Sequence, residues 1–185
     1  MIRFKPIFAL ALGLFLALSL SACGLLDLFG NSSEPAAGSS QANASPVREG
    51  LAAPDFDFVT IDGKTGSLSD YRGKVVLLNF WATWCGYCID EMPDMQKIRE
   101  EYPEVVVLAV VRSDDSVRAK NFALDKGYDF VWALDDDASI AGIYPSNGIP
   151  YSIIIDREGT IGTIYEGSAP NMFLYFQKAI LDAGA

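Results

Sequence analysis

Two cysteines, Cys85 and Cys88, stand two residues apart in the 185-residue chain and are the groups best suited to chemistry. An apolar, strand-like run precedes them and an amphipathic, helix-like segment follows them. At a helix start, free backbone amides and the helix dipole stabilise a thiolate on the first cysteine. The second cysteine lies one turn further in and is expected to be less exposed. Since the thiolate is the attacking species in disulfide exchange, the spacing predicts Cys85 as nucleophile and Cys88 as resolving thiol of a disulfide that forms and opens.

The rest of the composition excludes several other chemistries. The chain has no histidine, which excludes Ser–His and Cys–His catalysis and histidine metal ligands. Haem attachment would need a histidine where Ile89 follows Cys88. A zinc site needs four ligands, and the remaining cysteine, Cys23, lies far from the pair. A purely structural disulfide is the other alternative, although so short a loop restrains the unfolded chain little. We therefore expect neither a metal nor a cofactor.

The segments that flank the pair predict how it is positioned. Residues 75–80 and 105–111 are almost wholly apolar, as in strands that are covered on both faces. Between them, five side chains recur at helical spacing and predict a helix after Cys85: Ile89, Met92, Met95, Ile98 and Tyr102.

The remaining elements complete an α/β pattern. We expect a half-buried strand near residues 56–60, a helix that ends at Gly127, a short helix after Asp137 and an amphipathic C-terminal helix. Further strands are predicted at 130–134, 151–156 and 160–165. Because the last two form a hairpin, the pattern predicts a central mixed β-sheet flanked by helices.

The first fifty residues have the composition of a targeting signal followed by a flexible linker. Arg3 and Lys5 precede an apolar run at 7–20. Its fourteen residues reach about 21 Å as a helix, which is short of the roughly 30 Å of a bilayer core. The run therefore predicts a secretion signal rather than a membrane span.

The end of this run, Leu20-Ser21-Ala22-Cys23, resembles the lipobox of bacterial lipoproteins. The resemblance implies cleavage before Cys23 and lipid on its sulfur. The alternative is an ordinary signal peptide that leaves Cys23 as a free thiol, a hazard in an oxidising compartment. Gly, Ser, Asn, Ala and Pro dominate the next segment and predict a flexible tether. The expected organisation is a signal at 1–22, a lipidated cysteine and linker at 23–50, and a folded domain at 51–185.

The run Asn79-Phe80-Trp81-Ala82-Thr83-Trp84-Cys85-Gly86-Tyr87-Cys88 resembles the active-site segment of the TlpA/ResA-like branch of the thioredoxin superfamily. Glu91-Met92-Pro93 and Gly148-Ile149-Pro150 resemble two further motifs of that family, and matches at its opening stretch extend the resemblance over about residues 52–182.

This resemblance implies a thioredoxin-like fold with an N-terminal β extension. It implies a cis Ile149–Pro150 bond that faces the cysteines, and a functional Glu91. Helical spacing puts Glu91 one turn from Cys88, so we expect it to move the proton on and off this thiol. The alternative is an acid that only complements the helix dipole. Trp84, Gly86 and Tyr87 would border the site together with Ile149. Trp81 and Trp84 could instead be simple core and rim residues.

The leading hypothesis is a membrane-anchored thiol–disulfide oxidoreductase on the extracytoplasmic face of a bacterial membrane. The resemblance favours reduction of client-protein disulfides, as in cytochrome c maturation, with a membrane thiol partner as electron donor or acceptor. The alternatives are an oxidase or isomerase, since the Gly86-Tyr87 pair also occurs in isomerases, and a non-catalytic lipoprotein binding module. A thiol peroxidase would need Pro-x-x-x-Thr-x-x-Cys, which the sequence lacks. The net charge of −10 argues against nucleic acid as a partner.

Overall fold

A computed structural model describes residues 47–185. The expected signal segment, Cys23 and most of the expected linker lie outside the described residues. Within 47–185, none of the helices is both long and apolar enough to cross a membrane. The chain contacts the domain just before residue 51: the Gly50 N–H donates to the Ile161 carbonyl at 2.8 Å, and the Glu49 carboxylate accepts from the Ile164 N–H at 2.9 Å.

Seven strands form one sheet within residues 47–185, in the order β2-β1-β5-β4-β3-β6-β7. The strands are β1 (Asp57–Thr60), β2 (Thr65–Ser67), β3 (Val76–Trp81), β4 (Val106–Val111), β5 (Val131–Leu134), β6 (Tyr151–Ile155) and β7 (Ile161–Glu166). The helices are the 3₁₀ turn η1 (Leu68–Tyr71), α1 (Gly86–Glu101), α2 (Ser116–Lys126), α3 (Ser139–Ile143) and α4 (Met172–Asp182).

The two apolar runs form the centre of this sheet, where every residue of β3 and β4 is buried. β3, β4 and β5 are parallel, whereas β6 is antiparallel to β3 and to β7. In the β3–β4 register, Trp81 pairs with Val111. The loops that follow these two residues therefore leave the sheet side by side, and one of them carries the cysteine pair.

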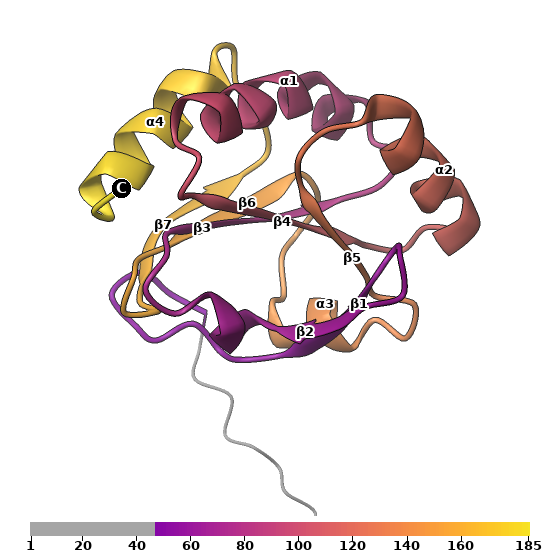
Figure 1. The fold of residues 1–185 in the computed structure, drawn as a ribbon, viewed down its shortest axis with the longest axis horizontal. Coiled ribbons are helices and arrows are strands. Elements are labelled where there is room, and N and C mark those ends of the chain that lie inside the picture. The colour runs from indigo at the N-terminus through magenta and orange to yellow at the C-terminus, as the bar shows by residue number, and fades with distance from the viewer. Residues whose placement is uncertain (1–46) are drawn as a thin grey trace, which may run out of the picture. The chain divides into compact units, whose positions relative to one another are not determined.

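Side chains alternate between two cores, one on each face of the sheet. Leu77 and Trp81 of β3 join the core beneath α1, α2 and α4. Leu78 and Phe80 join the opposite core, which η1 and α3 cover. In Figure 1, α1, α2 and α4 lie above the central strands and α3 lies below them. This alternation decides which polar side chains of β3 can reach α1.

The mixed sheet, the helix after the cysteines, the closing hairpin and the amphipathic C-terminal helix are all confirmed. The predicted N-terminal extension is the β1–β2 hairpin, whose first strand pairs with β5. β2 and η1 were not predicted from the sequence. β2 has only three residues and no large apolar side chain, so it carries no periodic signal. Gly66 permits it, because a Cβ there would lie 2.9 Å from Cζ of Phe58.

Candidate active site

Cys85 and Cys88 meet at the start of α1. They form a disulfide with an S–S distance of 2.04 Å. Cys85 is the N-cap residue of α1, in an extended conformation, and its sulfur accepts the Cys88 N–H at 3.2 Å. The same amide, together with the N-terminal end of the helix dipole, stabilises negative charge on this sulfur when the pair is reduced. Cys85 is 6% exposed and Cys88 1%, so the first cysteine is the more accessible one.

A buried carboxylate on the neighbouring loop fixes the segment before Cys85. One oxygen of Asp114 accepts both the N–H and the hydroxyl of Thr83 at 2.6 Å. Burial opposes ionisation of Asp114, but these bonds hold its pKa below the ordinary value. The Trp84 indole N–H donates to the Ser113 carbonyl at 3.1 Å. The loop after β4 therefore positions the cysteine loop. This role was not predicted from the sequence, where its only signal is that Asp114 follows the strand beside β3.

A buried polar chain crosses from the sheet to α1 behind the cysteines. Asn79 and Ser152 stand opposite each other in the β3–β6 register. The Asn79 amide donates to the Ser152 hydroxyl at 2.8 Å and to Oε1 of Glu91 at 2.9 Å. All three side chains are at most 2% exposed. Helical spacing places Glu91 one turn from Cys88, with Cβ atoms about 5–6 Å apart.

Glu91 is a weaker acid than an ordinary glutamate, because burial raises the pKa of its carboxyl to about 7. The Ser168 hydroxyl and the Asn79 amide lower it, and nearby Asp94 adds to the rise. Among the described residues, Oε2 of Glu91 has no hydrogen-bond partner. Because Oε1 already accepts the Asn79 amide, Oε2 is the oxygen of this carboxyl that is left without a hydrogen bond.

The loop before β6 borders the site from the sheet side. The Ile149–Pro150 peptide bond is cis, as the family resemblance implies. Tyr151 pairs with Phe80 across the β3–β6 ladder. Pro150 therefore lies at the same end of the strands as the cysteine loop, which follows β3. Pro150 is buried and Ile149 is half-buried.

The aromatic residues around the cysteines divide clearly between core and rim. Trp81 is fully buried, with ring centroids 5.1 Å from Trp132 and 5.2 Å from Phe122. Trp84 and Tyr87 are 59% and 74% exposed. Gly86 is exposed between the two cysteines. Trp81 is thus a core residue, and the exposed rim of the site is aromatic.

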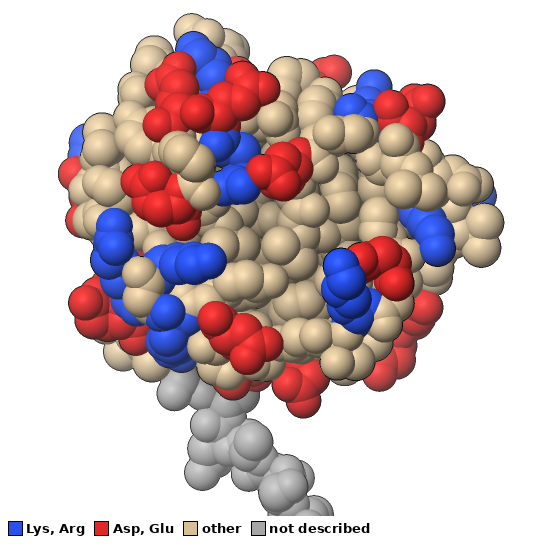
Figure 2. Space-filling model, viewed as in Figure 1, with Lys and Arg blue, Asp and Glu red and all other residues tan. Residues whose placement is uncertain are grey.

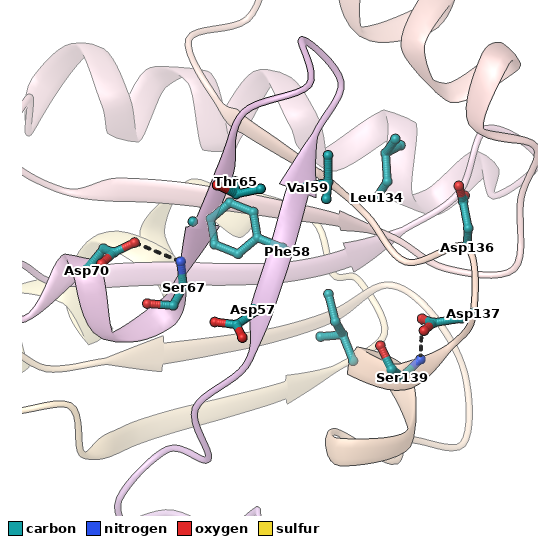
Figure 3. Close-up of a pocket in the computed structure, with 12 residues that line it drawn as sticks. Asp57, Phe58, Val59, Thr65, Ser67, Asp70, Leu134, Asp136, Asp137 and Ser139 are labelled. Carbon is teal, nitrogen blue, oxygen red and sulfur yellow. Dashed lines mark hydrogen bonds between the residues drawn. The ribbon is translucent and has the colours of Figure 1, made fainter.

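A hollow of ≈ 910 Å³ lies elsewhere, between the β1–β2 hairpin and the start of α3 (Figure 3). Two of its carboxylates cap backbone amides: Asp70 accepts from Ser67 at 2.8 Å and Asp137 from Ser139 at 3.1 Å. None of its lining residues belongs to α1 or to the loop before β6. These two carboxylates therefore serve local structure.

Charge is distributed without a single dominant sign on the face shown in Figure 2, where Lys and Arg side chains lie among Asp and Glu side chains. Within residues 47–185, no cluster of His, Cys, Asp or Glu side chains is arranged to hold a metal ion. The chemistry that the described site supports is that of its two thiols and the buried carboxyl.

Comparison with known proteins agrees with this geometry. The family model described as the AhpC/TSA family matches residues 50–164. The thioredoxin-like protein YneN of Bacillus subtilis (strain 168) is 40% identical over 129 residues, covering 66% of this chain and 74% of that protein. The thiol-disulfide oxidoreductase ResA of Bacillus thuringiensis (strain Al Hakam) is 35% identical over 122 residues, covering 65% of this chain and 70% of ResA.

A similar solved structure is that of a putative thiol:disulfide interchange protein DsbE from Chlorobium tepidum. Its TM-score is 0.69 at 32% identity, over 74% of this chain and 97% of that one. Fold, family match and relatives agree with the cysteine pair at the start of α1. The chain therefore belongs to the AhpC/TSA family and is a thiol–disulfide oxidoreductase of thioredoxin-like fold.

Proposed function

We propose that this protein reduces disulfides of client proteins on the extracytoplasmic face of a bacterial membrane, to which lipid on Cys23 anchors it. The observation that carries the proposal is the buried carboxyl of Glu91, whose pKa is raised to about 7, one helical turn from the resolving thiol. An acid placed there takes part in thiol chemistry at neutral pH, because it gains and loses its proton in that range.

The reaction begins with the reduced pair. The Cys85 thiolate attacks one sulfur of a client disulfide, whose S–S bond breaks as a mixed disulfide forms. The other client sulfur leaves as a thiolate and takes a proton. Cys88 then attacks the Cys85 sulfur, which closes the protein disulfide and releases the second client thiol. Two electrons pass from the protein dithiol to the client, and a membrane thiol donor restores them by the reverse exchange.

Glu91 serves the second step in this scheme. Cys88 is almost fully buried, so its proton has no direct route to bulk water. Ionised Glu91 accepts that proton on Oε2, while the Asn79 amide holds Oε1. In the reverse direction, protonated Glu91 returns the proton to Cys88 as the disulfide is reduced.

The same carboxylate supports the reducing direction. A disulfide is a strong oxidant when the reduced form of the pair is stabilised as a thiolate. A buried negative charge on Glu91 disfavours thiolate at the neighbouring Cys88, and the chain has no histidine to offset that charge. The reduced pair therefore gives up its electrons more readily than the pair of a strong oxidant.

The reduction potential tests this direction. We expect the Cys85–Cys88 pair to equilibrate near the thioredoxin value of about −270 mV, well below the roughly −120 mV of the strong periplasmic oxidant. Equilibration in dithiothreitol buffers gives the value, with the fluorescence of the neighbouring Trp84 as readout. A potential near that of the oxidant would contradict the proposed reductase and favour an oxidase.

The anchor is tested by fractionation of bacterial cells. We propose a cleaved signal at 1–22, an acylated Cys23 with a linker to residue 50, and the folded domain at 51–185. Cys23→Ala should move most of the protein from the membrane fraction to the soluble fraction, because the acidic domain gains nothing from anionic lipid. Cys85→Ala is the matched control and should stay with the membrane. Equal membrane retention of both variants would refute lipidation at Cys23.

A further inference from the structure

A second hollow, of ≈ 350 Å³, adjoins the cysteine pair. Its lining includes Trp84, which directly precedes Cys85, and Ile149, which directly precedes Pro150. The remaining lining residues come from the loop after β4 and the loop before β6: Arg112, Ser113, Ser146, Asn147 and Gly148. The hollow therefore lies beside the position at which a client disulfide meets Cys85.

Arg112 supplies the positive charge of this hollow. It is half-buried, and its guanidinium donates to the Ser146 hydroxyl and, at 3.5 Å, to the Ser146 carbonyl. The Ser146 hydroxyl in turn donates to the Gly148 carbonyl at 2.8 Å. Both acceptors are neutral, so these contacts hold the guanidinium in place without forming an ion pair.

Two carboxylates near the hollow make contacts to groups other than Arg112. The Glu166 carboxylate accepts from the Asn147 side-chain amide at 3.5 Å. The Asp114 carboxylate accepts the N–H and the hydroxyl of Thr83, and its other oxygen lies 3.9 Å from Nη1 of Arg118. Among residues 47–185, Arg112 makes no ion pair. A guanidinium has five N–H donors, so Arg112 can still bind an added carboxylate although the net charge of the chain is −10.

We propose that this hollow is a specificity subsite that binds a carboxylate side chain of the client, close in sequence to the client's reactive cysteine. The proposal rests on the proposed exchange with client disulfides and names the feature that the site selects. A planar guanidinium binds a carboxylate through two parallel hydrogen bonds. The fixed Trp84 indole, held by the Ser113 carbonyl at 3.1 Å, forms a rigid wall beside it.

The overall charge makes such a subsite selective. An acidic surface repels strongly acidic clients over long distances, so the attraction exerted by Arg112 is local. A client with one Asp or Glu beside its cysteine gains the contact at Arg112 and avoids most of the repulsion. We therefore expect recognition of a single carboxylate near the disulfide, not of an acidic segment.

The test uses the reduced full-length protein and short peptides whose single cysteine is in a mixed disulfide with 2-mercaptoethanol. Matched peptides carry Glu, Gln, Leu or Lys at each position next to the cysteine in turn, and the rate of protein oxidation is followed by tryptophan fluorescence. At the favoured position, Glu should react about tenfold faster than Gln, the order expected for a charge-assisted contact in a half-buried site. Lys should react more slowly than Gln.

Arg112→Gln should bring the Glu/Gln ratio close to one, and Arg112→Lys should keep part of it, because a point charge attracts the carboxylate without the fork geometry. Lys120→Gln removes a positive charge from an exposed site and should leave the ratio as in the parent. Hydroxyethyl disulfide has no side chain for the subsite, so all variants that fold correctly should reduce it at the parental rate.

Two results would overturn the subsite: a Glu/Gln ratio near one in the parent, or the parental ratio in Arg112→Gln. Faster reaction of the Leu peptide than of the Glu peptide would also overturn it and identify an apolar pocket. If the parent fails to reduce hydroxyethyl disulfide, the proposed reductase itself is wrong, and that result is distinct from a lost preference between peptides.

Discussion

Replacement of Cys85 by serine should abolish disulfide exchange, with a loss of at least roughly 1000-fold in rate, the scale seen when an enzyme loses its nucleophile. The attacking group must be ionised, and a serine hydroxyl is not ionised near neutral pH, whereas a thiol at a helix N-terminus is. Cys85 is the N-cap residue of α1, and its sulfur accepts the Cys88 amide. Exchange is measured with a peptide disulfide and purified protein.

Cys88→Ser should instead accumulate the mixed disulfide between Cys85 and the client. Here Cys85 still attacks, but nothing resolves the mixed disulfide, so the adduct with the client accumulates and is visible on a non-reducing gel. Cys85→Ser should trap no adduct, because Cys88 is almost fully buried within α1. Equal trapping by the two variants, or trapping by Cys85→Ser alone, would reverse the assigned roles.

Glu91→Gln should change the pH dependence of stability in the oxidised protein. Burial raises the pKa of Glu91 to about 7 from an unfolded value near 4.5, so the folded state holds this proton more tightly than the unfolded chain. The stabilisation is fully present below pH 4.5 and is lost as pH rises through about 7. At about 1.4 kcal/mol per pKa unit, the loss is at most roughly 3 kcal/mol.

Glutamine keeps an acceptor for the Asn79 amide but does not titrate. Between pH 4.5 and 8, the free energy of unfolding of the parent should therefore fall by up to about 3 kcal/mol relative to that of Glu91→Gln. Urea unfolding at a series of pH values measures this difference. The same variant should also slow resolution of the mixed disulfide by about 100-fold, because the base beside Cys88 is lost.

Asp90→Asn is the matched control for both readouts. Asp90 precedes Glu91 in α1 but is exposed, since adjacent helical residues point about 100° apart. It should follow the parent in stability and in resolution rate. If the stability difference between the parent and Glu91→Gln stays constant with pH, the carboxyl does not titrate as described, and Glu91 is only a charge near the end of the helix.

The fold was largely readable from the sequence because its elements carry strong local signals. Continuous apolar runs predicted β3 and β4, helical periodicity predicted α1, and two strand-like segments around a turn predicted the β6–β7 hairpin. The three-residue strand β2 has no such signal, and its pairing with β1 depends on the close packing of Gly66 against the Phe58 ring. Short elements of this kind are selected by their neighbours in space.

The cysteine pair was equally readable, since its chemistry depends on two residue types at a fixed spacing and at a helix start. Helical geometry also placed Glu91 on the same side of α1 as Cys88. Both inferences concern residues within two turns of one helix. Local geometry is a property of the chain alone, so the sequence determined which cysteine lies at the start of α1, which lies one turn further in, and the position of the nearby carboxyl.

Tertiary structure alone decided what surrounds these groups. Strand register sets Ser152 opposite Asn79, and the meeting of two loops sets Asp114 against Thr83. The packing of a third loop sets Arg112 beside Trp84. Each of these pairs joins residues far apart in the chain, so no periodic pattern connects them. The raised pKa of Glu91 is likewise decided by the tertiary structure, because the burial that causes it depends on how α1 packs against the sheet.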